Sequence, residues 1–268
     1  MVELKKIQDN IYKIFVEFDR ICCKYNIQYS MEGGTLLGAV KYQDYVPWDD
    51  DIDVIMRRDD YEKFIQIAPK EIDNKFFVQS FDNVKEFPLN YAKICLKGTK
   101  ICNYDYSHLK NMNHGIFMDI FPIDNVVPNK LRQHCSSVGV FTSARKVKLG
   151  VKLRAKGIKK VAFKLLSFLP LKFLTKKVKK NCTKYNKERT GYRYEVCNSN
   201  KNFPPMPAEM YDEYVELEFR GGKFKAVKEY DKLLKSRFGE DYMDALPPVE
   251  KRKPSHNQNI VFEEGFDE

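Results

Sequence analysis

The stretch from Glu32 to Val54 restricts the possible folds of this chain more than any other part of the sequence. It reads EGGTLLGAVKYQDYVPWDDDIDV and places four aspartates within five positions. Carboxylates this close repel one another, so such a cluster is stable mainly where a cation or a positively charged ligand offsets its charge. A divalent metal ion is the obvious candidate. The four acids are Asp49, Asp50, Asp51 and Asp53.

The elements around the acids indicate how such an ion would be used. Residues 27–31 predict a strand, Gly33-Gly34 a tight turn and Thr35 to Lys41 a short helix. In a strand that follows, Asp51 and Asp53 share one face, and Asp49 joins them if the strand begins early enough. The turn and the helix N-terminus would offer N–H groups to a phosphate. Mg²⁺ (or Mn²⁺) would bind between the acids and the substrate phosphates.

Simpler interpretations exist for each part of this pattern. A lone Gly-Gly pair is usually only a turn, and a run of acids is usually a solvated loop or a helix cap, which suits Asp49 and Asp50 taken by themselves. The order strand, diglycine, helix and Asp-Ile-Asp favours metal-dependent phosphoryl chemistry, because it brings a phosphate cradle next to a metal-binding ridge.

The same stretch resembles the signature of the LicD family, the phosphocholine transferases of bacterial surface glycans, to which fukutin and fukutin-related protein are related. Residues 115–124 (GIFMDIFPID) are similar to the second block of that family, and residues 238–248 (FGEDYMDALPP) to its C-terminal block. The resemblance implies a nucleotidyltransferase-type fold in which the diglycine turn and the Asp-x-Asp strand bind metal and nucleotide. Sixteen residues separate Gly34 from Asp51, more than in the wider superfamily, although the LicD-like pattern has the same longer insert.

A further carboxylate is expected from the chemistry of phosphoryl transfer. The acceptor hydroxyl must lose its proton as the new bond forms, and an aspartate beside the metal can take it. We predict that Asp119 has this role, because it alternates with apolar residues in the strand predicted over 116–121, where a carboxylate is costly unless it faces a polar site. Asp124, after Pro122, is expected to cap or turn, and Asp105 is a weaker candidate.

Other residues near these motifs have possible roles in donor binding. Glu32 could support the metal or contact a ribose hydroxyl, or cap the helix. Trp48, the only tryptophan, could stack on a base or on a quaternary ammonium, or pack in the core. Lys93 could neutralise a donor phosphate, and Arg252 and His256 could close over the nucleotide or belong to a polar tail. The predicted substrate-binding set is Glu32, Gly33, Gly34, Thr35, Trp48, Lys93, Arg252 and His256.

Length and composition indicate a globular enzyme of the α/β or α+β class, with helices flanking a mixed sheet. Of the 268 residues, 43% are hydrophobic, enough for a substantial core. Seven cysteines without a C-x-x-C pair indicate reduced, mostly buried thiols. Periodicity predicts helices over 4–25, 58–68 (ended by Pro69) and 229–238, strands over 76–81, 91–96, 100–104 and 116–121, and a hairpin over 214–219 and 223–227.

The net charge of +10 is unevenly distributed. Residues 125–187 contain eighteen Lys or Arg and no Asp or Glu, so the rest of the chain carries −8. Within residues 145–180, lysines alternate with aliphatic and aromatic residues, and Gly157 and Pro170 should break the segment into separate helices. This mixture is typical of amphipathic helices on an anionic membrane surface. A solvated helical pair is the simpler alternative, and nucleic-acid binding is disfavoured because no reader motif is present.

We therefore predict a catalytic core over 1–124, a basic helical insertion over 125–187 and a C-terminal part over 188–268 that completes the core. The resemblance implies transfer of phosphocholine from CDP-choline to a lipid-linked glycan precursor of the teichoic acid, lipopolysaccharide or capsule type. Transfer of ribitol or glycerol phosphate, nucleotidyl transfer, and a non-enzymatic cation-binding role at the membrane surface stay open. Neither a secretory signal nor an apolar run of spanning length is evident, so we expect a cytoplasmic, peripheral protein at the inner face of the membrane.

Overall fold

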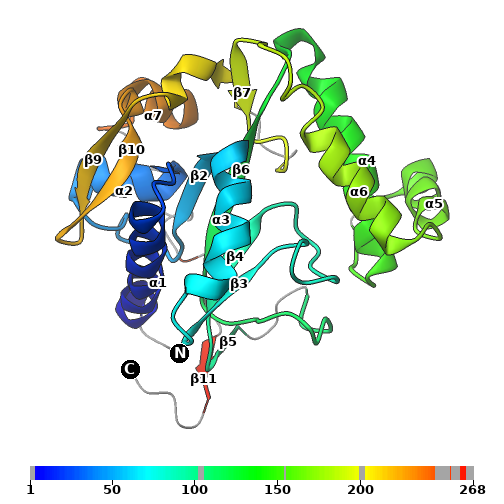
Figure 1. The fold of residues 1–268 in the computed structure, drawn as a ribbon, viewed down its shortest axis with the longest axis horizontal. Helices are drawn as coiled ribbons and strands as arrows, with labels where there is room; N and C mark the ends of the chain where they lie inside the picture. Colours follow the sequence, from blue (N-terminus) through cyan, green and yellow to red (C-terminus); the bar gives the residue numbers. More distant parts are fainter. Residues whose placement is uncertain are drawn as a thin grey trace.

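The computed structural model describes residues 4–101, 106–153, 155–198, 203–244, 254 and 260–263 (Figure 1). A mixed sheet lies at the centre, with helices packed around it, which confirms the predicted fold class. Its strands are β1 (Ser30–Met31), β2 (Asp53–Arg57), β3 (Phe76–Gln79), β4 (Ala92–Leu96), β6 (Phe117–Asn125), β7 (Tyr192–Tyr194) and β8 (Met206–Pro207).

The order of the strands brings distant parts of the chain together. The main path runs β1-β2-β6-β4-β3, and β7 pairs with both β6 and β8. Strands β2 and β6 are parallel, whereas β1 with β2, β6 with β4, and β4 with β3 are antiparallel. The two central strands, β2 and β6, therefore start at the same edge, and the acidic residues at their beginnings become neighbours.

Helices α1 (Leu4–Lys24) and α3 (Arg58–Glu71) pack against this sheet and against each other. The predicted apolar stripe of the first helix is confirmed, since residues such as Ile11, Phe15 and Phe18 are fully buried. Phe18 meets the rings of Tyr29 and Phe64, with centroids 4.8 and 5.0 Å away. This aromatic core fixes the sheet from one side.

The C-terminal part of the core packs beside the diglycine segment. The predicted hairpin is confirmed as β9 (Tyr214–Phe219) and β10 (Gly222–Val227), followed by α7 (Tyr230–Phe238). Strand β10 contacts β1, while β9 and α7 contact α2 (Gly33–Tyr42). Residues from the end of the chain therefore stabilise the segment that carries the first motif. A separate pair joins β5 (Thr99–Ile101) to β11 (Ile260–Phe262).

Several predicted elements differ from the structure. The Gly33-Gly34 pair, expected as a tight turn before a helix over 35–41, forms the first two residues of α2, although Gly33 has the positive φ of a turn residue (+56°). The strand expected over 27–31 is reduced to β1, and Pro69 does not end its helix, because α3 continues to Glu71 with Pro69 in its last turn. The strand expected to stop at Phe121 extends to Asn125, where pairing with β7 continues it. Asp124 therefore lies in a strand, and the prediction that it caps or turns is wrong. Residues 102–104 of the strand predicted over 100–104 lie outside the described residues.

The basic part of the chain contains three helices, α4 (Leu131–Lys148), α5 (Gly157–Leu166) and α6 (Leu171–Cys182). Helix α4 packs along α6 and also contacts α5, and Figure 1 shows α5 at the edge of the molecule, away from the sheet. The expected breaks are confirmed, because α5 begins at Gly157 and α6 begins directly after Pro170. No helix in the described ranges combines the length and apolar composition needed to cross a membrane. The proposed boundaries of the insertion stay a prediction.

Candidate active site

Two carboxylates and one ammonium group form a row across three neighbouring strands. Asp53, the first residue of β2, is the register partner of Asp119 in β6, and Asp119 is in turn the partner of Lys93 in β4. Side chains at register positions of adjacent strands project to the same face of a sheet. Lys93 Nζ lies 2.6 Å from Asp119 Oδ1. The structure thus brings together three residues that the sequence predicted separately.

The diglycine turn lies against two acids of the cluster. Gly33 has a φ of +56°, and a Cβ built on it would lie 4.0 Å from Asp53 Oδ2. A Cβ on Gly34 would lie only 2.2 Å from Asp49 Oδ2, so the absence of a side chain there allows the close approach of Asp49. The Asp53 amide donates a hydrogen bond to Thr35 Oγ1 (2.9 Å), which fixes α2 to the start of β2. The N-terminus of α2 therefore faces carboxylates.

The loop before β2 differs from the expected geometry. The strand begins at Asp53, so the prediction that Asp51 and Asp49 extend it is wrong. Exposure nevertheless alternates, because Asp51 and Asp53 are half-buried and Ile52 is fully buried. Asp50 is 0% exposed, which contradicts its interpretation as part of a solvated loop. Gln8 Nε2 donates to the Asp49 carbonyl (2.8 Å) and anchors this loop to α1.

The carboxylates fit a hard divalent cation as judged by their chemistry. Within the described residues, no group of three or more His, Cys, Asp or Glu side chains is gathered to hold a metal by itself. Mg²⁺ requires less than that, because it retains several waters and binds through one or two carboxylates together with substrate phosphates. The close approach of Asp49 and Asp53 to the diglycine turn supplies oxygen ligands where a phosphate would bind.

Glu32 is held in place by a residue that sequence reasoning missed. It is fully buried at the N-cap of α2, but its side chain makes no capping hydrogen bond, so the capping alternative is wrong. Arg237 Nε in α7 instead lies 2.5 Å from Glu32 Oε1, and the guanidinium lies 4.6 Å from the centre of the Phe203 ring. Burial alone would lower the pKa of Arg237, but the charge of Glu32 and their hydrogen bond raise it. Nothing in the sequence near Arg237 indicates this partner.

The remaining residues predicted to bind substrate lie in different environments. Lys93 is 2% exposed and paired with Asp119, so its predicted contact with a phosphate requires that pair to rearrange. Trp48 is half-buried and is not part of the buried core of the described residues. Arg252 and His256 lie outside the described residues.

The cysteines are consistent with the expected reduced state. The six that the structure describes are free, and four of them are buried: Cys22, Cys95, Cys182 and Cys197. Cys95 follows Lys93 in β4, and burial raises its pKa to about 12. This thiol is therefore protonated at neutral pH.

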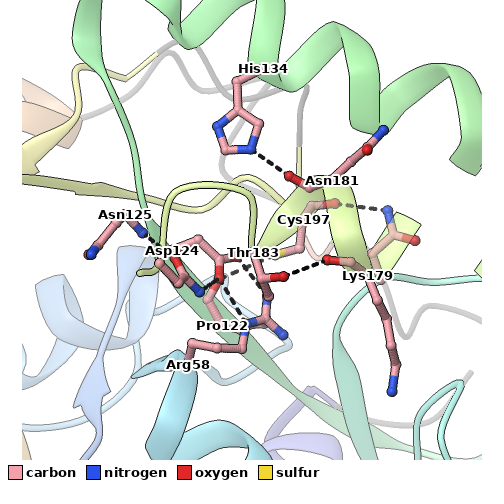
Figure 2. A network of polar contacts seen from close by, with 11 residues as sticks. Arg58, Pro122, Asp124, Asn125, His134, Lys179, Asn181, Thr183 and Cys197 are labelled. Carbon is pink, nitrogen blue, oxygen red and sulfur yellow. Dashed lines mark hydrogen bonds and ion pairs between the residues drawn. The ribbon is translucent and has the colours of Figure 1, made fainter. Parts of the chain in front are cut away.

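Asp124 has a structural role at the far end of β6, as Figure 2 shows. Its two carboxylate oxygens accept hydrogen bonds from Arg58 Nε (2.8 Å) and Nη2 (2.6 Å), and Asn186 Nδ2 adds a third at 2.7 Å. Burial alone would lower the pKa of Arg58, but the charge and hydrogen bonds of Asp124 raise it well above the usual range. This network joins α3, β6 and the segment after α6, and both carboxylate oxygens accept hydrogen bonds in it.

A cavity of about 690 Å³ lies next to the row of charged residues rather than on it. Its walls come from the segment before β4 and from α4 and α5, and they include Asn90, Tyr91, Lys146, Ile158 and Lys159. The centre of the Tyr91 ring lies 4.4 Å from that of Phe121 in β6, with the two rings tilted, and 5.7 Å from Lys93 Nζ. One wall of the cavity is therefore in contact with the row.

The mixed sheet thus carries carboxylates at the starts of two parallel strands, next to a diglycine pair at a helix N-terminus. Residues 26–143 match the family model described as LicD/FKTN/FKRP, nucleotidyltransferase domain. The chain is also 31% identical, over 90% of its length and 91% of the relative, to the lipopolysaccharide cholinephosphotransferase LicD of Haemophilus influenzae. An uncharacterized protein of Rickettsia typhi is 39% identical over 61 residues, which is 23% of this chain and 20% of that protein. The chain belongs to the LicD family.

Proposed function

We propose that this protein transfers phosphocholine from CDP-choline to a hydroxyl of a cell-surface glycan precursor. The observation that carries the proposal is the register of Asp53, Asp119 and Lys93 beside the diglycine turn. Membership of the LicD family supports a phosphotransferase. The similarity to the Haemophilus cholinephosphotransferase, which covers nearly the whole chain, supports phosphocholine as the transferred group.

The donor would bind with its diphosphate at the N-terminus of α2. The first N–H groups of a helix lack intrahelical partners and favour anions, and the absence of side chains at Gly33 and Gly34 allows close approach. Asp51 and Asp53, with Asp49, would hold Mg²⁺ or Mn²⁺. A bound divalent ion would neutralise the diphosphate and the charge on the departing CMP. Trp48 is half-buried and precedes the acids in the sequence, and its ring would contact the quaternary ammonium of choline.

Asp119 and Lys93 would act on the acceptor as a coupled pair. In the resting protein, Lys93 neutralises Asp119 at 2.6 Å. When the donor binds, its phosphate competes for the Lys93 ammonium, and the Asp119 carboxylate becomes available to the acceptor hydroxyl. The acceptor oxygen then forms a bond to phosphorus, the bond from phosphorus to the CMP oxygen breaks, and Asp119 takes the hydroxyl proton. Binding of the donor thereby makes Asp119 available as the general base.

Two further features would position the substrates. The ion pair between Glu32 and Arg237 holds the start of α2 against α7, so the diglycine turn is fixed by a buried contact. The cavity next to Tyr91 offers an aromatic ring together with hydroxyl, amide and ammonium groups, a mixture that suits a sugar acceptor. Because Tyr91 contacts the Lys93 ammonium, an acceptor in this cavity would lie beside the catalytic row.

The decisive experiment incubates the purified protein with CDP-choline, MgCl₂ and a candidate lipid-linked glycan. We expect release of CMP and a glycan mass increased by one phosphocholine, detected by mass spectrometry. Asp53→Asn should reduce turnover by at least about 10³-fold with little change in melting temperature, since it relieves carboxylate repulsion. The matched control is Asp59→Asn, an exposed aspartate in the first turn of α3, which should retain normal turnover.

Other outcomes separate the remaining activities. CMP release from CDP-ribitol or CDP-glycerol, but not from CDP-choline, would identify an alditol phosphate as the transferred group. Release of pyrophosphate from a nucleoside triphosphate would indicate nucleotidyl transfer. Binding of the metal without any effect of nucleotide on its affinity would support the non-enzymatic role. Full activity of Asp53→Asn would contradict the assigned site.

A further inference from the structure

Helix α5 and the turn after it present an apolar stripe that no part of the described protein covers. Ile158 is 89% exposed, Val161 59%, Leu165 65% and Phe168 76%. The spacing of three and four residues places Ile158, Val161 and Leu165 along one side of α5, and Phe168 follows in the turn after it. Four large, highly exposed apolar side chains within eleven residues are uncommon on a soluble monomer and mark an interaction surface.

The opposite side of α5 already attaches the helix to the protein. Phe163 and Leu166 are half-buried, Ala162 and Phe163 line the cavity against α4, and Lys148 Nζ in α4 donates to the Ser167 carbonyl (3.0 Å). The exposed stripe is therefore not required for the packing of α5. Figure 1 shows the helix at the edge of the molecule, where a flat surface could reach it.

The charge around the stripe identifies the kind of partner. The exposed lysines next to it are Lys156, Lys159, Lys160, Lys164 and Lys172. No acidic residue occurs between positions 125 and 187, so the whole region is positive. A second copy of this chain would bring the same charge to the contact and be repelled. An anionic surface with an apolar interior satisfies both the lysines and the stripe.

We propose that α5 docks this protein onto an anionic lipid membrane and lies in the plane of the interface. The stripe would enter the boundary between headgroups and acyl chains, and the lysines would remain at the level of the phosphates. This docking does not depend on the proposed reaction. If that reaction holds, docking also brings the cavity to the membrane, because Ile158 and Lys159 line the cavity as well as belonging to α5.

The test measures vesicle binding by flotation of the full-length protein. Vesicles of phosphatidylcholine containing phosphatidylglycerol should bind it, and vesicles of phosphatidylcholine alone should bind it much less. The double variant Val161→Ser/Leu165→Ser should lower the partition coefficient on the order of tenfold or more for each side chain removed. Because both side chains are exposed, circular dichroism and melting temperature should not change.

Matched controls distinguish binding through this surface from nonspecific adsorption to vesicles. Val16→Ser changes a side chain of α1 that is 45% exposed, and Lys223→Ser changes an exposed lysine of β10, so neither should alter binding. Lys160→Ser/Lys164→Ser should weaken binding to anionic vesicles. The difference in binding between this variant and the wild type should decrease as the salt concentration is raised. Equal binding of the wild type and Val161→Ser/Leu165→Ser would overturn the proposal. Self-association of the free protein through the stripe, measured by sedimentation, would also overturn it.

The vesicle assay needs neither donor nor acceptor. Failure of the wild-type protein to bind anionic vesicles, together with normal CMP release on a water-soluble acceptor, would contradict this inference and leave the proposed reaction intact. Normal vesicle binding without any phosphocholine transfer would contradict the proposed reaction and leave the docking inference intact.

Discussion

The two ends of strand β6 carry aspartates that differ in exposure and in the type of cationic partner. Asp119, near the start, has a side chain that is 13% exposed and forms an ion pair with Lys93. Asp124, near the end, has a side chain that is 0% exposed and accepts three hydrogen bonds from Arg58 and Asn186 (Figure 2). Both acids lie in an apolar strand, where an ionised carboxylate needs compensation.

The comparison shows how a structural carboxylate differs from one available for chemistry. A bidentate guanidinium and an amide occupy Asp124, and exchange of such a pair for a substrate would leave a buried cation without its partner. A lysine ammonium is a point charge on a flexible stem, and it can move to a phosphate. Asp119 also lies in register with Asp53, beside the diglycine turn, whereas Asp124 lies where the core meets α6. Position and type of partner, rather than burial alone, distinguish the two roles.

The largest expected effect belongs to Asp119. Asp119→Asn should lower kcat by about 10³-fold, because the variant cannot accept the proton of the acceptor hydroxyl. The variant also leaves the buried Lys93 ammonium without its counter-charge, so stability should fall as well, and kcat is compared at a temperature where the variant is folded. Steady-state assays with saturating donor and acceptor measure the effect. A kcat within threefold of the wild type, roughly 0.6 kcal/mol, would remove the distinction between the two ends of β6.

Asp124→Asn should have the next largest effect, and on stability instead of turnover. It leaves Arg58 buried without a full counter-charge, which should reduce the free energy of unfolding by about 3 kcal/mol. Urea denaturation followed by circular dichroism measures this loss. The fraction that remains folded should turn over normally. A large loss of kcat at a temperature where the variant is folded would show that Asp124 also belongs to the active site.

Gly34→Ala tests the approach of Asp49 to the diglycine turn. The new methyl group would stand 2.2 Å from Asp49 Oδ2, so the flexible carboxylate must move away. We expect a loss of kcat on the order of 10²-fold with a stability change within about 1 kcal/mol. Gly34→Ala/Asp49→Ala removes the clash without restoring the carboxylate. Recovery of activity in this double variant would show that the position of Asp49 does not matter.

The smallest expected effect is on the pH dependence of folding stability, through a histidine in the helical region. His134 in α4 is 3% exposed, and burial lowers its pKa. The unfolded chain then binds a proton more readily than the folded chain, so stability is full above about pH 6.5 and falls as pH decreases through the depressed value. His134→Gln can keep a donor for the Asn181 carbonyl but has no titratable group, so its melting temperature should change less between about pH 8 and pH 5.5. Identical pH profiles for the two proteins would contradict this assignment.

Much of the local structure could be predicted because it depends on neighbours in the sequence. The apolar stripe of α1, the hairpin β9–β10 and the breaks at Gly157 and Pro170 follow from periodicity, turn residues and the backbone limits of glycine and proline. The order of the diglycine turn and the aspartates predicted that these residues lie close together, and the structure confirms their proximity. The boundaries of β1, β2 and β6 could not be predicted in this way, because pairing with other strands decides where a strand begins and ends.

The sequence by itself determined the residues of the first motif, the basic region and the family. Only the tertiary structure decided the partners: Lys93 for Asp119, Arg58 for Asp124, and Arg237 for Glu32, more than two hundred residues away. It also decided that Asp50 is buried and that the stripe of α5 is exposed. The physical reason is that spacing along the chain fixes the direction of side chains within one element, while burial and ion pairing depend on how distant elements pack together.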